Sequence, residues 1–302
     1  MNTKYEEIVS VGSIGREENP IKNNEILAKA VLEKLKPAEK DVKQIALLCI
    51  DVQQDFMDGG ELGVPGAIGD VERITRFIYD NMENITRIYC SLDTHNPFQI
   101  FHPSWWVDAD GKNAPPFTAI TLADIDAGKW FAVIDPVHSR EYVEKLETNG
   151  KKTLVVWPYH CLQGTRGQAL ENQFSNMVKF YEVARKSHVV NLIKGNDPLS
   201  EMYGIIKPEY DRKNFINIDL LNKLESFDKI IICGEAKSHC VLESIKQILE
   251  YYSGRPEITK KVYILEDCMS VIPSFEDSTR DAYAEFTTKY KVNIIKSTEM
   301  KF

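Results

Sequence analysis

Short, continuously apolar runs rich in β-branched residues alternate along the chain with segments of helical periodicity. Unbroken apolar runs are typical of strands covered on both faces, and strands that alternate with helices form mostly parallel sheets through right-handed crossovers. The sequence therefore predicts an α/β fold. We expect strands at Ile45–Asp51, Thr86–Leu92, Thr153–Trp157, His188–Ile193, Lys229–Cys233, Val262–Leu265 and Val292–Ile295, and helices at Val71–Asn81, Gln168–Lys186, Cys240–Tyr252 and Ser278–Tyr290.

Two segments fall outside this alternation. Residues 1–43 are charged and carry apolar residues at helical spacing from Ile26 to Leu35, so we interpret them as a partly helical N-terminal extension that packs against the core. Within the main domain, residues 44–302, a long insertion at about 103–150 lacks clear strand periodicity. A loop of that length in a compact domain is usually functional or a lid. We expect most of its aromatic residues to serve packing.

Composition excludes some classes of protein. The chain has 302 residues and a formal net charge of -8, which argues against binding a nucleic-acid backbone. No stretch approaches the roughly 20 apolar residues of a membrane helix. The first residues lack the apolar core of an export signal. The six cysteines include no Cys-x-x-Cys pair. They indicate reduced thiols and a cytoplasmic location.

Polar residues recur where the predicted strands end. Because the carboxyl ends of parallel strands meet at one edge of a sheet, these side chains are expected to converge there. This recurrence of polar residues at strand ends is the strongest evidence for a functional site that the residues themselves provide. The residues concerned are Asp51, Asp93, His95, His160, Lys194 and Cys240.

Cys240 lies where a strand turns sharply and a helix begins. A thiol at a helix N-terminus is near the positive end of the helix dipole, which favours the thiolate, and the same N–H groups can stabilise an oxyanion. A lone cysteine is nevertheless more commonly a small buried hydrophobe. The nucleophile interpretation of Cys240 therefore depends on its neighbours.

Lys194 and Asp51 supply those neighbours. Taken alone, a lysine that ends an apolar strand is explained by its ammonium reaching solvent, and Asp51 by capping a turn. Together with a thiol they have specific roles. A carboxylate can take the thiol proton and pass it to a leaving amine. A lysine between the two keeps the carboxylate charged and stabilises the thiolate.

A metal site is predicted from Asp93 and the histidines. Asp93 and His95 are two residues apart on an extended segment, so both side chains face the same way, and His102 and His160 follow in loops. A mixed oxygen and nitrogen set suits a divalent ion, zinc first and iron or manganese as alternatives. Any one histidine is better explained by local hydrogen bonding. Their gathering at strand ends favours the metal.

The motifs together resemble those of the isochorismatase-like cysteine hydrolases and, within them, the nicotinamidases. The resemblance covers the chain from about Ile45 to the end. It implies a six-stranded, mostly parallel sheet in a three-layer α/β/α sandwich. The matching segments, in order, are Ile50–Phe56, Asp93–His95 with His102, Trp157–Thr165, Ile193–Gly195 and Gly234–Val241.

The resemblance also implies a reaction. Asp51 would take the proton of Cys240, the thiolate would attack an amide carbonyl, and the backbone N–H groups of Ala236 and Cys240 would hold the oxyanion. The peptide bond between Glu235 and Ala236 would be cis. Ammonia would leave, and water would hydrolyse the thioester.

The resemblance further implies how the substrate is held. Phe56 and Trp157 would sandwich its ring. The metal at Asp93, His95 and His160, with His102 as a further candidate ligand, would orient the ring or a water. The expected substrate is nicotinamide or a similar small amide, and the expected assembly is a homo-oligomer.

Two departures from the nicotinamidase pattern leave the substrate open. Ser238 stands where an aspartate usually precedes the nucleophile, and Glu243-Ser-Ile-Lys replaces a common Thr-Ala segment. The alternatives are a relative that acts on another small amide, carbamoyl or ureido compound, and a non-catalytic binding protein on the same fold. The complete set Asp51, Lys194 and Cys240 favours an enzyme.

Overall fold

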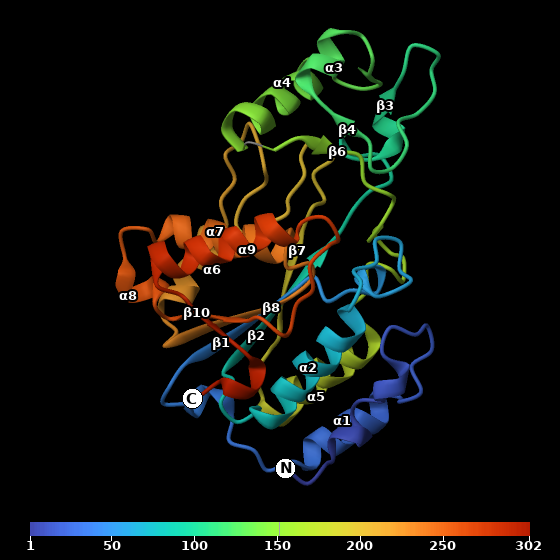
Figure 1. Ribbon diagram of the computed structural model, residues 1–302. Helices are drawn as coiled ribbons and strands as arrows, with labels where there is room; N and C mark the ends of the chain where they lie inside the picture. Colours follow the sequence, from blue (N-terminus) through green and yellow to red (C-terminus); the bar gives the residue numbers. More distant parts are fainter. Residues whose placement is uncertain (151) are drawn as a thin grey trace.

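The computed structural model describes residues 1–150 and 152–302, and a parallel sheet of six strands is at its centre (Figure 1). The strand order is β10-β9-β8-β1-β2-β7, and every neighbouring pair is parallel. The fold class predicted from the sequence is confirmed. The strands are β1 (Ile45–Ile50), β2 (Arg87–Asp93), β7 (Val190–Lys194), β8 (Lys229–Gly234), β9 (Val262–Leu265) and β10 (Asn293–Ile295).

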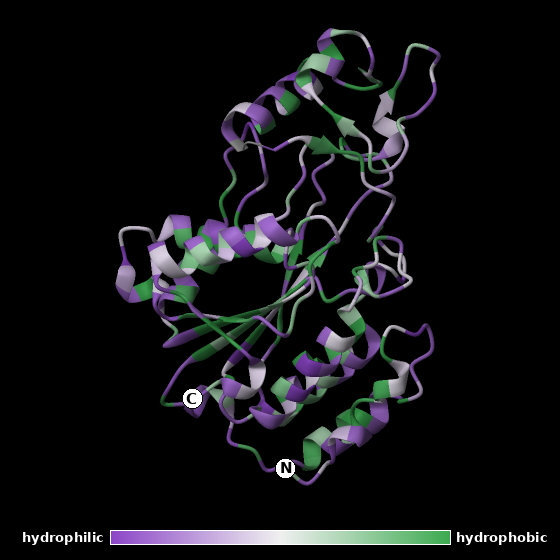
Figure 2. Cartoon of the chain, viewed as in Figure 1, coloured by the Kyte–Doolittle hydropathy of each residue, from purple (hydrophilic) through white to green (hydrophobic). Residues whose placement is uncertain are grey.

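Helices cover both faces of the sheet (Figure 1). Alternate residues of β1 point to opposite faces, so Leu47 and Cys49 join one core cluster while Leu48 and Ile50 join the other. Figure 2 shows the strands as the most hydrophobic part of the chain. The first cluster is covered by α2 (Ala67–Asp80) and α5 (Asn172–Arg185), and the second by α6 (Ile218–Glu225), α7 (Cys240–Tyr251) and α9 (Glu276–Glu285).

Shorter helical segments complete the chain. The predicted helix Ser278–Tyr290 is α9 followed directly by a π-helical turn at Phe286–Tyr290, and a second π-helical turn, Leu146–Gly150, follows α4 (Pro136–Lys145). The others are α8 (Pro256–Thr259) and 3-10 turns at Tyr5–Glu7, Val11–Ser13, Ala38–Lys40, Gln54–Phe56, Pro103–Trp105 and Ser297–Glu299.

The N-terminal segment packs on the outside of α2 and α5. Its helix α1 (Asn23–Leu32) lies beside α5 and buries Ile26 in the core cluster of that face. The Tyr5 hydroxyl is 2.7 Å from the Thr75 hydroxyl of α2, and the Arg76 guanidinium stacks over the Tyr5 ring. Through these contacts the N-terminal segment covers α2 and α5 and adds buried side chains to the core cluster of that face.

The insertion is a separate lobe at the carboxyl edge of the sheet (Figure 1). It has its own apolar cluster, which includes Trp105, Trp106 and Trp130, as expected for packing residues. Its elements are β3 (Trp106–Val107), β4 (Ala119–Ile120), α3 (Leu122–Asp126), β5 (Phe131–Ala132), α4 and β6 (Leu154–Val155).

One predicted strand of the main sheet is wrong. Only Leu154–Val155 of the run Thr153–Trp157 is extended as a strand, and it pairs antiparallel with β4 inside the insertion. The run is apolar because Leu154, Val156 and Trp157 pack in the cluster of the insertion. Among the residues that the structure describes, no helix has both the length and the hydrophobicity needed to cross a membrane.

Candidate active site

The site lies where β1, β2, β7 and the start of α7 meet. Lys194 ends β7, and its Nζ is 2.9 Å from Oδ2 of Asp51, the residue after β1, and 3.7 Å from Sγ of Cys240, the first residue of α7. All three side chains are buried. The structure therefore brings together the carboxylate, the lysine and the thiol that the sequence placed at separate strand ends.

Asp51 is held in place by Ser91 of β2. The Ser91 hydroxyl donates a hydrogen bond of 2.6 Å to Asp51 Oδ1 and accepts one of 3.0 Å from the Asp51 backbone N–H. The backbone of Asp51 has a positive φ of 46°, which turns the chain directly after the strand. This leaves Oδ2 of Asp51 directed at Lys194.

The protonation states of these groups follow from burial and from Lys194. Burial raises the pKa of the Cys240 thiol well above its usual range, and the Lys194 ammonium only partly opposes this. Burial also raises the pKa of Asp51, against the opposing effect of Lys194. Burial alone would lower the pKa of Lys194, but Asp51 and Asp93 raise it well above its usual range. A neutral thiol beside a carboxylate of raised proton affinity is arranged for proton transfer.

The turn before α7 presents backbone N–H groups to the same place. The peptide bond between Glu235 and Ala236 is cis, as the resemblance implied. The Ala236 carbonyl accepts hydrogen bonds from the N–H groups of His239 and Val241, whereas the N–H groups of Ala236 and Cys240 have no acceptor among the described residues. Such free donors can hold an oxyanion.

Asp93 connects the lysine to a cluster of histidines. Its Oδ1 is 3.0 Å from Lys194 Nζ, and its Oδ2 is 3.1 Å from His95 Nε2 and 3.8 Å from His160 Nε2. Ligand atoms of Asp93, His95 and His160 lie within 4.8 Å of one another. Gly195 is necessary here because a Cβ at this position would lie 2.6 Å from the Asp93 carboxylate.

The donor set of this cluster fits a divalent metal. Nδ1 of His95 is 2.8 Å from the Gly195 carbonyl, and Nδ1 of His160 is 2.8 Å from the Pro158 carbonyl, which fixes both rings with Nε2 facing Asp93. Nε2 of His95 is buried and has no aligned hydrogen-bond partner among the described residues. Two nitrogens and one oxygen converging on one point suit zinc, iron or manganese.

His102 lies next to this cluster and outside its closest group. Its ring centroid is 5.8 Å from that of His95 and 6.1 Å from that of His160. Both ring nitrogens are buried without a partner among the described residues, and burial lowers the pKa of His102 to about 3. Its role as a ligand remains a prediction. Asp51, Asp93 and Cys240 form a second close group, but the Lys194 ammonium already supplies the positive charge there.

His160 reaches the site through a loop that pairs with the end of β2. The His95 N–H donates to the Cys161 carbonyl, and the Gln163 N–H donates to the His95 carbonyl at 2.8 Å. Asp55 fixes the same loop by accepting a 2.6 Å hydrogen bond from the Cys161 N–H. The predicted position of His160 is therefore reached without the strand that was expected before it.

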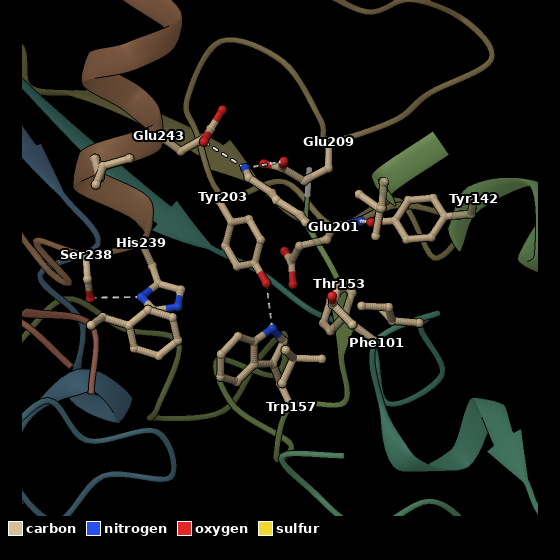
Figure 3. A pocket seen from close by; sticks show the side chains of 16 residues that line it. Phe101, Tyr142, Thr153, Trp157, Glu201, Tyr203, Glu209, Ser238, His239 and Glu243 are labelled. Atoms are coloured by element: carbon tan, nitrogen blue, oxygen red, sulfur yellow. Dashed lines mark hydrogen bonds and ion pairs between the residues drawn. The ribbon is translucent and has the colours of Figure 1, made fainter. Parts of the chain in front are cut away.

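A narrow cavity of about 30 Å³ opens onto Cys240. Phe56 and Trp157, the two expected ring contacts, both line it, together with Tyr203 and His239. The Trp157 indole N–H donates a 2.9 Å hydrogen bond to the Tyr203 hydroxyl (Figure 3). Burial lowers the pKa of His239 to about 4, so this ring is neutral near pH 7. His138 and His188 lie outside this cavity.

Sequence reasoning missed Ser91, Glu201 and Tyr203. A polar residue in an apolar strand, two positions before Asp93 and so on the same face, was the signal that could have found Ser91. Glu201 and Tyr203 follow β7 in an irregular loop, where no periodicity indicates which way a side chain points.

The fold and these residues define the class of protein: a three-layer α/β/α fold around a six-stranded parallel sheet, with a buried Asp-Lys-Cys group at the carboxyl edge of that sheet. No family model matches the chain, and no curated protein matches it in sequence. Solved structures do match its fold.

The chain is similar to solved nicotinamidases. A nicotinamidase/pyrazinamidase of Acinetobacter baumanii shares 19% identity over 86% of this chain and 99% of that one, with a TM-score of 0.58. The yeast nicotinamidase Pnc1p, bound to the inhibitor nicotinaldehyde, shares 19% identity over 84% of this chain and 100% of that one, also with a TM-score of 0.58. These likenesses show that the chain has the fold of these nicotinamidases.

Proposed function

We propose that the protein hydrolyses the C–N bond of a small amide, as a member of the nicotinamidase-like branch of the isochorismatase-like hydrolases. One observation carries the proposal: the Lys194 ammonium contacts both a buried carboxylate, Asp51, and a buried thiol, Cys240, at the base of a cavity. Neither fold nor stability requires these three groups to be buried together, since burying charged groups is costly.

Each step uses groups already in place. Asp51 takes the proton of Cys240, and the thiolate forms a bond to the amide carbonyl carbon. The free N–H groups of Ala236 and Cys240 bind the resulting oxyanion. Asp51 returns the proton to the leaving nitrogen as the C–N bond breaks. Water then attacks the thioester, which releases the acid and restores the thiol.

Asp93, His95 and His160 would hold a divalent metal, which when bound supplies a Lewis-acidic point for a ring nitrogen or a water. His102 adjoins this set and is a further candidate ligand. The protein residues orient the substrate around it. The rings of Phe56 and Trp157 line the cavity from which the amide would approach Cys240, and an aromatic ring between them would be held by stacking.

Nicotinamide is the first substrate to test. Besides the Pnc1p complex with nicotinaldehyde, a solved structure of PnC1 from L. infantum in complex with nicotinate matches at 16% identity, over 88% of this chain and 98% of that one, with a TM-score of 0.53. A larger amide is the second candidate. It is favoured because Ser238 and Glu243, two residues that depart from the nicotinamidase pattern, line a larger adjoining cavity.

The test is ammonia release from nicotinamide by the metal-loaded protein, compared with its Cys240→Ala variant. We expect turnover that the substitution abolishes. Cys90→Ala is the matched control, because Cys90 is an equally buried cysteine in the core cluster of the opposite face. Turnover that persists in Cys240→Ala would exclude the cysteine mechanism. Absence of turnover on every amide tested would favour a non-catalytic binding protein.

A further inference from the structure

A second cavity of about 430 Å³ adjoins the narrow cavity above Cys240. The two share wall residues, namely Trp157, Glu201, Tyr203 and His239. A volume of this size is in the range of pockets that bind drug-sized ligands, and a small amide over Cys240 would leave it unfilled. We call this second cavity the outer chamber.

The insertion and the main domain build the outer chamber together. Tyr142 and Leu146 come from α4 and the turn after it, and Lys152–Val155 from the segment that returns to the main domain. The opposite wall is formed by residues around the start of α7, from Ser238 to Glu243. Ser238 and Glu243, which depart from the nicotinamidase pattern, therefore line the same cavity as residues of the insertion.

The outer chamber has an excess of negative charge. Three carboxylates line it, those of Glu201, Glu209 and Glu243. Among its described lining residues, Lys152 is the one cation, because His239 is neutral near pH 7. Lys152 pairs with Glu209 and lies 2.7 Å from Glu243 (Figure 3). Its charge is thus engaged by two of the three carboxylates.

Glu201 is the carboxylate of these three that does not pair with Lys152. It is only 4% exposed, and its Oε1 accepts a 2.8 Å hydrogen bond from the Met202 N–H. It forms no ion pair with any residue in the described part of the chain, whereas Glu209 and Glu243 both do. Figure 3 shows its carboxylate directed into the space that the labelled residues enclose. Burial raises the pKa of Glu201 to about 7, and the charges of His95 and Lys194 oppose this only in part.

Aromatic rings surround this carboxylate. Tyr203, Trp157, Phe101 and Tyr142 all line the same cavity. A carboxylate set among aromatic faces is the environment that binds organic ammonium groups, because the ion pair and the cation–π contacts act together. An apolar or anionic group would leave the Glu201 carboxylate desolvated without a partner, and a neutral hydroxyl could donate a hydrogen bond but would not supply an opposite charge.

We propose that the outer chamber binds an ammonium-bearing arm of the substrate, and that Glu201 is the residue that selects it. The proposal rests on the proposed function, because the scissile amide of the same molecule would lie at Cys240. It identifies the substrate class as small amides with a cationic amine extension.

The test uses two amides that differ only at the end of one arm. Both are pyridine carboxamides with a short alkyl arm, which ends in a primary ammonium in one and in a hydroxyl in the other. We expect the metal-loaded protein to prefer the ammonium compound in kcat/KM. Glu201→Gln should reduce that preference by about 10- to 100-fold, because a buried charge loses its partner. Glu201→Asp, which keeps the charge, should retain most of the preference.

Glu250→Gln is the matched control, since it removes the same charge at the exposed far end of α7 and should leave the preference unchanged. Equal kcat/KM for the two amides, or a preference that survives in Glu201→Gln, would overturn the proposal while the hydrolase function stands. Calorimetric binding of both amides separates the remaining case. A preference for the ammonium compound in binding that Glu201→Gln abolishes, without turnover, would support the chamber and refute the hydrolase.

Discussion

At the scale of single residues, the site depends on one ammonium shared by three acidic groups. Lys194 Nζ is 2.9 Å from Asp51, 3.0 Å from Asp93 and 3.7 Å from the Cys240 sulfur, and it donates to the Met202 carbonyl. Without it, the buried Asp51 carboxylate would have no counter-charge within the described part of the chain. Lys194 therefore serves both the stability of this edge of the sheet and the ionisation of the thiol.

Replacing Lys194 by Met should lower both activity and stability. We expect kcat/KM to fall by roughly 10²- to 10⁴-fold, as for loss of acid–base catalysis. The free energy of unfolding should fall by about 3–5 kcal/mol, the typical cost of an uncompensated buried charge. Ammonia release and urea unfolding measure the two effects.

Lys29→Met is the control, because the Lys29–Glu7 pair is on the surface, with 41% of each side chain exposed. It should cost less than about 1 kcal/mol. If the two lysine variants unfold at the same urea concentration, Lys194 does not neutralise the buried carboxylates.

Ser91→Ala tests a residue that positions Asp51 and does not touch substrate. The Asp51 carboxylate and N–H would each lose a partner, which costs about 1–3 kcal/mol when the group stays buried. We expect kcat to fall by about tenfold, equivalent to ~1.4 kcal/mol. KM should change little, since Ser91 does not line the cavity. The exposed Ser226→Ala variant should leave both constants unchanged, and a Ser91→Ala effect confined to KM would contradict the assignment.

Much of this site could be predicted from the sequence, because strand ends are visible in the apolar pattern and parallel strands bring their ends together. Asp51, Asp93, Lys194 and Cys240 were placed in this way, and the structure gathers them. Glu201 could not be predicted, because its orientation depends on how a loop of irregular backbone packs against the insertion.

At the scale of elements, the apolar pattern assigned one extended run to the wrong sheet. The run Thr153–Trp157 has the composition of a buried strand, yet it completes the core of the insertion and pairs with β4. Local composition reports that a segment is buried and extended. Which sheet it joins depends on contacts that are distant in sequence, and those contacts cannot be read from the run itself.

The N-terminal segment was expected to pack against the core, and the contacts of α1 permit a direct test. Ile26→Ala should lower the free energy of unfolding by about 2–5 kcal/mol, because Ile26 is 1% exposed within the main core cluster. Val31→Ala on the same helix should change it by less than about 0.5 kcal/mol, because Val31 is 70% exposed. Urea unfolding of the two variants measures both changes in the free energy of unfolding. Equal effects would mean that the segment is not part of the cooperative core.

At the scale of the whole molecule, the site is assembled where the sheet and the insertion meet. His95 follows β2, whereas His160 lies on the chain that returns from the insertion, in a loop that is fixed by backbone pairing to His95. A metal bound by Asp93, His95 and His160 would therefore join two parts of the structure that otherwise have separate apolar cores. Binding free energy at such a site also contributes to folding free energy.

Metal content and thermal stability should therefore change together. We expect about one divalent ion per chain by elemental analysis, and a melting temperature that falls after chelation. A metal present at a thousand times its Kd stabilises the fold by about 4 kcal/mol. His160→Ala should lose the ion and should no longer respond to the chelator. His188→Ala, which removes an exposed histidine, should behave like the parent protein. If chelation lowers the melting temperature of His160→Ala as much as that of the parent, the ion that stabilises the protein is bound elsewhere. The cluster around Asp93 would then have to be explained by hydrogen bonding alone.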